Sequence, residues 1–291
     1  MYAIAGVTGH VGSVAAETLL SQGKPVRVIV RDAAKGAPWK AKGADVAVAD
    51  LNDEAALTRA FAGATAAFVL LPPSQAMTSP QPIEANTRLA RTIAAAVRAA
   101  KLPHVVLLSS VGAQHADGTG PIKALHVAER ELAATGAALT AVRAAYFQEN
   151  WGAALGALAQ DILPTFVPKQ LRYQQVATKD IGRTVAAALV EGAAPGTKTA
   201  IELAGPRDYT AEDVAAALTK LTGRTITATD APLDAVVPTF TSFGISAAVA
   251  ELYREMYEGI ISGRVAPEAG NRSVRGSVEV GDTLATLLGS K

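Results

Sequence analysis

Cysteine is absent from this sequence of 291 residues. Its absence excludes disulfide bonds, cysteine-ligated metal ions and a thiol nucleophile. Only 4 histidines are present, and they are scattered without the H-x-x-x-H or similar spacing of a metal site, so we expect no bound metal. The sequence also lacks an uninterrupted apolar run of about 20 residues, which a membrane-spanning helix needs. We therefore expect no membrane span.

An excess of charge of one sign is also lacking. Lys and Arg number 27 and Asp and Glu 26, which gives a formal net charge of +1. This balance argues against a nucleic-acid partner bound by bulk electrostatics and leaves only a local patch open. The N-terminus has no basic leader, and Gly6, Gly9 and Gly12 interrupt its apolar residues, unlike a signal peptide. We expect a cytoplasmic protein.

Apolar residues are plentiful enough for a large core, at 49% hydrophobic and only 18% charged. This composition excludes disorder as the main state. Apolar runs typical of buried strands alternate with stretches that have the 3.6-residue periodicity of helices. The expected strands cover residues 2–7, 25–30, 45–49, 66–71, 104–109 and 138–143, and the expected helices 11–20, 34–42, 54–61, 83–100 and 123–135.

This alternation predicts the fold class. Strands that are apolar throughout and separated by helices form a parallel sheet covered on both faces. Right-handed crossovers make it a doubly wound, Rossmann-type α/β sheet. We assign residues 1–150 to this domain, with returning segments near 172–204, and residues 151–291 to a smaller, mostly helical α/β domain on the substrate side. The second half should hold strands over 174–178 and 200–203 and helices over 180–190, 210–221 and 232–257.

A glycine-rich turn follows the first expected strand. The sequence reads Gly6-Val7-Thr8-Gly9-His10-Val11-Gly12, a G-x-x-G-x-x-G pattern that leads into the first expected helix. One glycine makes the tight turn, one lets the backbone approach a pyrophosphate, and one packs the helix against the strand. The helix N-terminus supplies free N–H donors and the positive end of the helix dipole. At the first β–α turn of an alternating chain, the pattern predicts a dinucleotide site rather than a plain turn.

The residues after the second expected strand indicate which dinucleotide binds. In a dinucleotide domain an acidic residue here binds the 2′-hydroxyl of NAD(H), whereas an arginine accommodates the 2′-phosphate of NADP(H). This chain has Arg31, then Asp32, with Lys35 nearby. A guanidinium can bind the phosphate through two hydrogen bonds, so we expect NADP(H), with Arg31 and Lys35 at the phosphate. Asp32 would repel that phosphate if it pointed inward, which keeps NAD(H) open.

Further candidate cofactor contacts lie at the carboxyl ends of the later strands, where ligands bind in open α/β sheets. After the third strand, Asp50 is expected to accept from the adenine amino group, with Leu51 against the adenine face. Asp50 is equally suited to the start of a helix. The ends of the fourth and fifth strands add Leu70, Leu71, Pro72, Ser109 and Ser110 as cofactor contacts.

Other segments along nearly the whole chain complete a specific combination of motifs. Besides residues 6–12 and Arg31, it comprises residues 70–73, 109–112, 139–143, 146–150, 176–182 and 201–206. This combination resembles the NmrA-like branch of the atypical short-chain dehydrogenases/reductases. The resemblance implies an NAD(P)-binding fold with a small C-terminal substrate domain. Members of that branch include NAD(P)H-dependent quinone, azo-dye and triphenylmethane-dye reductases, isoflavone-type reductases and non-catalytic NADP(H) sensors.

The resemblance also indicates which catalytic motif this chain lacks. Standard short-chain dehydrogenases carry Tyr-x-x-x-Lys on the helix after the fifth strand, with the tyrosine as proton donor. This chain has no tyrosine between Tyr2 and Tyr146, which excludes that motif. Many NmrA-like reductases keep a lone lysine near this point, and Lys123 is the nearest candidate. His126, one turn on, is either a second candidate catalytic residue or an ordinary polar helix residue.

The expected substrate contacts follow the sixth strand. We expect Tyr146, Phe147, Asn150 and Trp151 to cover the nicotinamide and stack a flat substrate; alternatively, this aromatic segment closes the interface between the two domains. Quinones and cationic dyes accept hydride without a strong protein acid, because delocalisation stabilises their products. The protein then has to orient the cofactor and the acceptor.

These features favour an NADPH-dependent reductase of a planar conjugated acceptor, such as a quinone or a dye. The alternative is a redox sensor that binds NADP(H) and acts through a protein partner. We expect a monomer or a homodimer, since dimers are the commonest closed oligomer.

Overall fold

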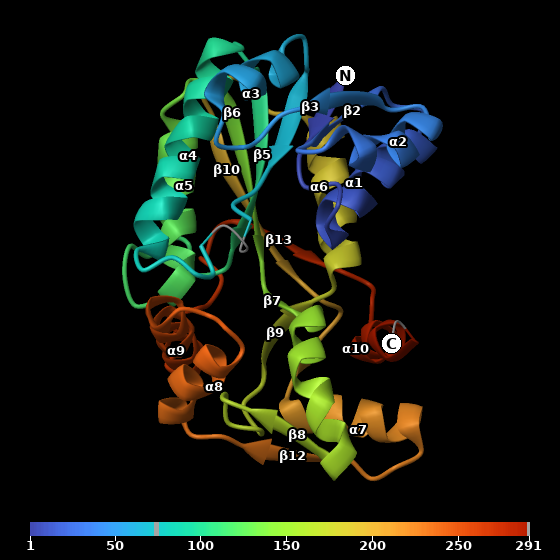
Figure 1. Ribbon diagram of the computed structural model, residues 1–291, viewed down its shortest axis with the longest axis vertical. Helices are drawn as coiled ribbons and strands as arrows, with labels where there is room; N and C mark the ends of the chain where they lie inside the picture. Colours follow the sequence, from blue (N-terminus) through green and yellow to red (C-terminus); the bar gives the residue numbers. More distant parts are fainter. Residues whose placement is uncertain (73–75, 290–291) are drawn as a thin grey trace.

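A parallel sheet of eight strands forms the centre of the molecule, in the order β13-β10-β6-β5-β4-β1-β2-β3 (Figure 1). The computed structural model describes residues 1–72 and 76–289. The chain order reverses between β1 and β4, so the glycine turn after β1 lies at the switch point, where doubly wound sheets bind ligands. The doubly wound α/β fold is confirmed. The strands are β1 Tyr2–Ile4, β2 Val26–Val30, β3 Asp45–Val48, β4 Ala66–Val69, β5 His104–Ser110, β6 Ala138–Ala144, β10 Lys198–Ala204 and β13 Arg272–Arg275.

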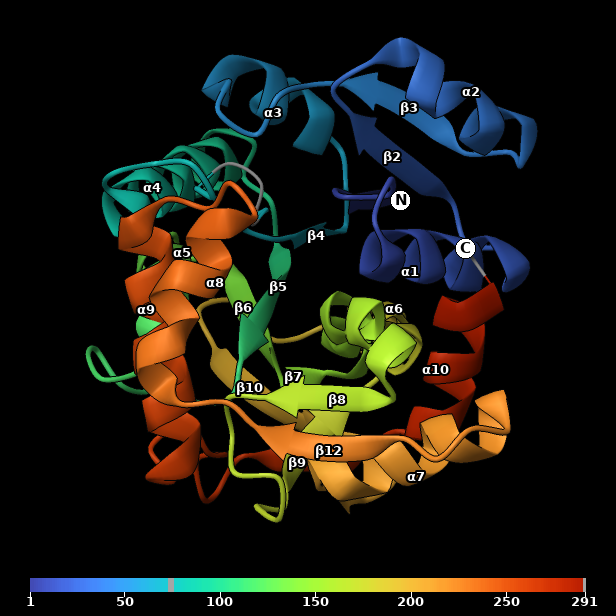
Figure 2. The same cartoon turned by 60° about the horizontal axis from the view of Figure 1, so that its bottom comes forward.

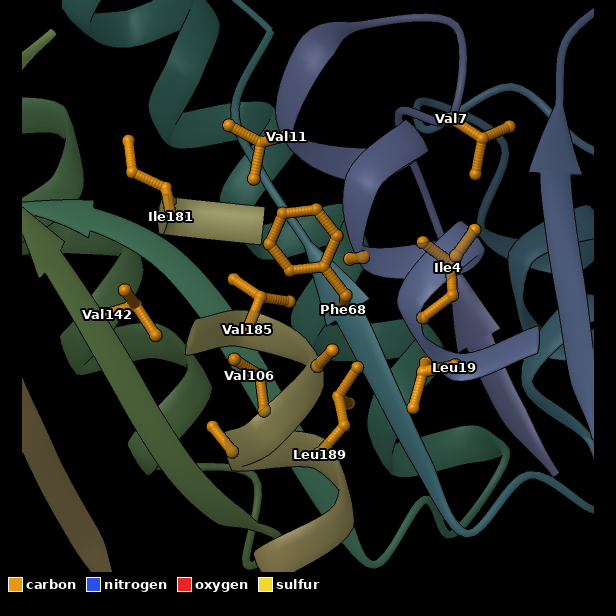
Figure 3. Close-up of a cluster of buried hydrophobic side chains, with 14 of the residues drawn as sticks. Ile4, Val7, Val11, Leu19, Phe68, Val106, Val142, Ile181, Val185 and Leu189 are labelled. Atoms are coloured by element: carbon orange, nitrogen blue, oxygen red, sulfur yellow. The ribbon is translucent and has the colours of Figure 1, made fainter. Parts of the chain in front are cut away.

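Helices cover both faces of the sheet, as the apolar strands require. On one face α1, α2 and α6 enclose a core that includes strand and helix side chains (Figure 3). On the other face α3, α4 and α5 pack over a second core. Labelled in Figure 3 are Ile4, Val7, Val11, Leu19, Phe68, Val106, Val142, Ile181, Val185 and Leu189. The helices are α1 His10–Ser21, α2 Ala33–Ala41, α3 Glu54–Phe61, α4 Pro82–Ala99, α5 Lys123–Ala133 and α6 Thr178–Glu191.

Two helix starts follow directly from capping residues. The Asp53 side chain accepts from the Ala56 N–H at 2.9 Å and begins α3. Thr210 and Asp213 form a reciprocal capping box at the start of α7 Ala211–Thr222. Such bonds satisfy N–H groups that have no partner within the helix.

The C-terminal half builds two smaller units below the sheet (Figure 2). The pair β8 Ile162–Thr165 and β12 Thr227–Asp230 packs with α7 and α10 Val280–Gly289 around one apolar core. A short sheet of β7 Tyr146–Phe147, β9 Tyr173–Val176 and β11 Asp208–Tyr209 joins this half to the large sheet. Of the helices in the described ranges, none has the length and apolar character needed to cross a membrane.

The expected single helix over residues 232–257 is wrong. The chain forms a 3-10 turn Leu233–Ala235, α8 Val236–Ser242 and α9 Ala247–Ile261. Gly244 has a φ of +80°, which breaks the helix, and the Ser246 side chain caps α9. The strand β13 and the 3-10 segment Gln148–Gln160 were not expected from the sequence. Pro73, part of the 70–73 motif, lies outside the described residues.

Candidate active site

The glycine turn has the geometry that the sequence predicts for an anion cradle. Gly6 has a φ of +68°, and its carbonyl accepts from the Gly9 N–H at 3.0 Å. A side chain on Gly12 would lie 2.4 Å from the Gly6 oxygen, so only glycine lets α1 approach this turn. The first N–H groups of α1 have no partner within the helix, and the first turn carries no acidic side chain. The turn can therefore accept phosphate groups.

A cavity of about 900 Å³ extends from this turn toward the C-terminal half. Its sheet end is formed by the glycine turn and the ends of β4 and β5. Its far end is mostly apolar and aromatic, with contributions from β7, β9 and α9, although Arg172 and Asp208 also line the cavity. Of the predicted contacts, Gly6, Gly9, His10, Val11, Gly12, Leu70, Leu71, Ser109, Ser110, Tyr146, Phe147 and Asn150 line the cavity. The fold thus brings the predicted cofactor turn and most of the predicted substrate segment to one space.

The two charged residues that follow β2, Arg31 and Asp32, differ in their contacts. The Asp32 side chain accepts from the Ala34 N–H at 2.9 Å and caps α2. Arg31 is exposed, and its guanidinium makes no ion pair with any residue that the structure describes. Lys35 is also exposed, in the first turns of α2. The carboxylate that could have favoured NAD(H) is therefore engaged in capping a helix.

The other predicted cofactor contacts lie around the cavity rather than in its lining. Asp50 accepts from the backbone and side chain of Asn52 at 2.8 and 2.9 Å, as expected for a loop that leads into a helix. Leu51 is buried in the core beneath α3. Thr8 is exposed on the glycine turn, and Pro72 is half-buried after β4.

The two serines that end β5 line the cavity but direct their hydroxyls elsewhere. Ser109 Oγ donates to Glu129 Oε1 at 2.7 Å, and Ser110 Oγ donates to the carbonyl of Val111 at 3.0 Å. Any cofactor contact from this segment would have to use other atoms of these residues.

The two catalytic candidates on α5 are both engaged by other groups of the protein. Lys123 Nζ lies 2.7 Å from Glu255 Oε2 on α9, and His126 Nδ1 lies 2.9 Å from the carbonyl of Ala113. Neither residue lines the cavity, although their neighbours Ile122, Ala124 and Leu125 do. Both side chains are held by partners that pack α5 against the rest of the protein. These contacts argue against either as the proton donor.

Trp151 also needs correction. It is only 5% exposed, and its indole N–H donates to Gln175 Oε1 at 2.8 Å. The ring packs with Leu155, Leu163 and Val214 in the C-terminal core, not in the cavity. Trp151 therefore cannot stack on a substrate there and instead joins the substrate segment to the C-terminal half.

Many lining residues of the far end were not identified from the sequence. Most come from α9, from the segment after it and from the region at the start of α4, and two others come from α5 and β9, all distant from one another in the chain. Their apolar pattern is equally typical of core residues, so no sequence signal separates the two. They include Met77, Ile83, Leu125, Tyr173, Val249, Leu252, Tyr253, Met256, Ile260, Ala266 and Pro267.

A buried cluster of charges lies behind Ser109. Arg143 is 3% exposed and binds Glu129 through Nε–Oε1 and Nη2–Oε2 contacts of 2.9 and 2.8 Å. Its Nη1 also lies 3.2 Å from Glu202 and 2.6 Å from Glu268. Burial alone would raise the pKa of Glu129, but the bonds and charge of Arg143 hold it below its ordinary value. The cluster fixes the segment that carries Ala266 and Pro267 into the cavity wall.

Within residues 1–72 and 76–289, no group of three or more His, Asp and Glu side chains is arranged to hold a metal ion.

The chain resembles known reductases in sequence. It is 25% identical over 263 residues to the NAD(P)H azoreductase of Xenophilus azovorans, with 88% of this chain and 86% of that protein covered. It is 28% identical over 232 residues to quinone oxidoreductase 2 of Escherichia coli (strain K12), with 78% and 76% covered.

Solved structures share its fold. The NADPH complex of the E. coli NADPH-dependent quinone oxidoreductase has a TM-score of 0.82 at 24% identity, covering 99% of this chain and 100% of that one. The Citrobacter sp. triphenylmethane reductase with NADP(H) has a TM-score of 0.80 at 17% identity, with the same coverage. The sequence model of the NmrA-like family matches residues 2–265. The chain therefore belongs to the NmrA-like family.

Proposed function

We propose that this protein is an NADPH-dependent oxidoreductase that transfers hydride to a planar conjugated acceptor such as a quinone or a dye. The main support is that one cavity of about 900 Å³ joins the glycine turn to a mostly apolar, aromatic end. Its volume is at the upper end of the range for small-molecule sites. The names of the related azo and quinone reductases support the same reaction class.

The residues of the turn fit the cofactor. Because Gly12 has no Cβ, α1 begins close against the glycine turn, and the N–H groups and dipole at its N-terminus would hold the pyrophosphate. Arg31 is free to bind a 2′-phosphate, since Asp32 caps α2. When bound, the reduced nicotinamide supplies the hydride, and the protein's part is to orient the acceptor and exclude water.

The far end of the cavity fits a flat, uncharged or delocalised acceptor. Phe147, Tyr146 and Tyr173 present aromatic surface, and α9 contributes Leu252 and Met256. Tyr146 and Tyr173 meet edge to face, with ring centroids 5.6 Å apart. Aromatic walls of this kind stack on planar molecules without requiring fixed charges.

An acceptor panel tests this function. Purified protein is mixed with NADPH and, in turn, with a quinone, an azo dye, a triphenylmethane dye and a simple aldehyde, and the absorbance of NADPH is followed. We expect turnover with at least one flat acceptor and none with the aldehyde. Tight NADPH binding without oxidation by any of them would contradict the proposal and favour an NADP(H) sensor.

Replacement of Arg31 tests the cofactor assignment. We expect Arg31→Ala to weaken NADPH binding about 10- to 100-fold, because charge-assisted hydrogen bonds are worth roughly 1.5–3 kcal/mol. NADH binding should change by less than about 2-fold, since NADH lacks the phosphate. Fluorescence titration of both cofactors measures the two constants. The control variant is Arg98→Ala, which removes an exposed arginine in the last turn of α4. Equal losses for NADPH and NADH in Arg31→Ala would show that the assignment is wrong.

A further inference from the structure

One stretch of the cavity wall is a single layer of chain between the cavity and solvent. Residues 262–271 connect α9 to β13, and the structure, which describes all of them, shows no helix or strand there. Most of these residues are exposed to solvent. Those that also line the cavity are Ser262, Gly263, Val265, Ala266 and Pro267. We call residues 262–268 the wall segment. Because no ladder or helix holds it, its position depends on the groups that bind it.

The middle of the wall segment is bound to the loop after β5. Gln114 Nε2 donates to the carbonyl of Ala266 at 2.9 Å in a partly buried contact. Arg264 Nε donates to the carbonyl of Asp117 at 2.9 Å, and the two side chains form an ion pair. Both of these side chains are exposed, so their pair should contribute little. The loop therefore fixes the segment as far as Ala266 and leaves the residues beyond it to another anchor.

The end of the wall segment is bound to the buried charge cluster. Glu268 Oε2 lies 2.6 Å from Arg143 Nη1, and Asn271 Nδ2 donates to the same oxygen at 3.2 Å. The Glu268 side chain is 47% exposed, whereas Arg143 is buried and already held by two bonds to Glu129. Hydrogen bonds between charged groups are stronger than those between neutral ones. Glu268 therefore ties the exposed segment to a cation whose own position is fixed by other residues.

We propose that Glu268 is a positioning residue for the acceptor. Its bond to Arg143 holds the wall segment against the far end of the cavity and so limits the size of the acceptor that fits there. This inference rests on the proposed function. Glu268 is not itself a lining residue, and it acts through the lining residues Val265, Ala266 and Pro267 that precede it in the chain. Their side chains are apolar and contact a flat acceptor by van der Waals packing.

Acceptors of different size provide an internal control. Without the bond to Arg143, the wall segment moves outward and this end of the cavity widens. A small quinone then loses apolar contacts, whereas a triphenylmethane dye, whose three rings need more room, gains space. The glycine turn, where NADPH would bind, lies at the other end of the cavity. A change that only lowered the stability of the protein would affect both acceptors alike.

The test compares Glu268→Gln with Glu258→Gln, which changes a carboxylate of similar exposure, 46%, that pairs with Arg254 on α9. We expect Glu268→Gln to raise KM for 1,4-naphthoquinone about 10-fold, equivalent to the loss of roughly 55 Å² of apolar contact. Its kcat should stay within about 2-fold of wild type, because the change affects binding of the acceptor. KM for the dye should stay level or fall, and Glu258→Gln should change none of these values. Equal rises of KM for quinone and dye, or an unchanged KM for quinone, would overturn the proposal.

Glu268→Gln should leave the protein folded, because Arg143 keeps its bonds to Glu129 and Glu202. Should the variant unfold, Gln114→Leu replaces it, since this change removes the donor to the Ala266 carbonyl and loosens the same segment. KM for the quinone should then rise while KM for the dye does not, and equal rises would contradict the proposal.

Amide hydrogen exchange separates this inference from the proposed function. Mass spectrometry follows exchange in residues 262–268 of the full chain, without cofactor or acceptor. The segment includes the Val265 N–H, which donates to the Gly259 carbonyl at 2.9 Å. We expect exchange at least about 5-fold faster in Glu268→Gln and unchanged in Glu258→Gln, because amides exchange faster where fewer contacts hold the chain. Equal exchange in wild type and Glu268→Gln would refute the role of Glu268. A wild type that oxidised NADPH with none of the acceptors would instead refute the proposed function, whatever the exchange.

Discussion

Gly12→Ala is expected to lose NADPH binding by more than 100-fold. The new Cβ would lie 2.4 Å from the Gly6 oxygen, 2.6 Å from the Gly6 carbonyl carbon and 2.7 Å from the Ala5 oxygen. All three are backbone atoms, so α1 must move away from the turn that holds the phosphates. Overpacking of this kind costs about 1–3 kcal/mol of stability as well.

Gly9→Ala separates the effect of the glycine turn on NADPH binding from its effect on stability. Gly9 has an ordinary φ of −106°, and its Cβ would meet nothing closer than 3.5 Å. We expect the variant to keep its unfolding temperature within about 2 °C and still to bind NADPH about 10-fold or more weakly, because the Cβ occupies the space of the pyrophosphate. Fluorescence titration and thermal unfolding measure both quantities. NADPH affinity within 3-fold of wild type in Gly12→Ala would contradict this account of the turn.

Arg143→Met is expected to remove about 3–5 kcal/mol from the free energy of unfolding. The variant leaves Glu129, 1% exposed, and the buried Glu202 without the cation that binds them both. Among the cations that the structure describes, Lys198 remains near Glu129, with its Nζ at 3.2 Å and its side chain 45% exposed. Urea denaturation at pH 7 measures the change. The control is Arg91→Met, since Arg91 pairs with Glu131 at 3.3 Å but is 62% exposed. That pair should contribute less than about 1 kcal/mol.

The pH dependence of these variants gives a second test of the cluster. In the wild type the pKa of Glu129 lies below its ordinary value. The Glu129 carboxylate therefore stabilises the folded protein when the pH is above the pKa of Glu129 in the unfolded chain. This stabilisation is lost as the pH falls through the pKa of Glu129 in the folded protein. In Arg143→Met burial dominates, the pKa of Glu129 rises, and stability falls as the pH rises. The difference between wild type and variant should thus shrink from pH 7 to pH 4, and a constant difference would contradict this assignment.

The sheet could be predicted because its strands are buried on both faces. Residues of β4, for example, are buried throughout, and such apolar runs between helical repeats fit a parallel sheet. Helix starts were predictable where a single side chain decides them, as at Asp53 and Thr210. The glycine turn was predictable for the same reason, since its constraint is local to residues 6–12.

The remaining features depend on partners that are distant in the chain. The strand β13 is largely exposed and carries arginines at both ends, so only its pairing with β10 makes it a strand. Lys123 is held by Glu255, 132 residues further along, and Trp151 by Gln175. Neither orientation can be read from local sequence. The substrate end of the cavity was unpredictable for the same reason, because α9 reaches it only in the folded chain.

The transfer of deuterium from NADPH to an acceptor shows whether hydride passes directly between the two molecules in the cavity. Protein, NADPH carrying deuterium at both C4 positions and a triphenylmethane dye are mixed in ordinary water, and the reduced dye is analysed by mass spectrometry. We expect reduced dye with a single deuterium on its central carbon, because acceptor and nicotinamide would share one cavity and the hydride would pass directly. Reduced dye without deuterium, or NADPH bound but never oxidised, would contradict it.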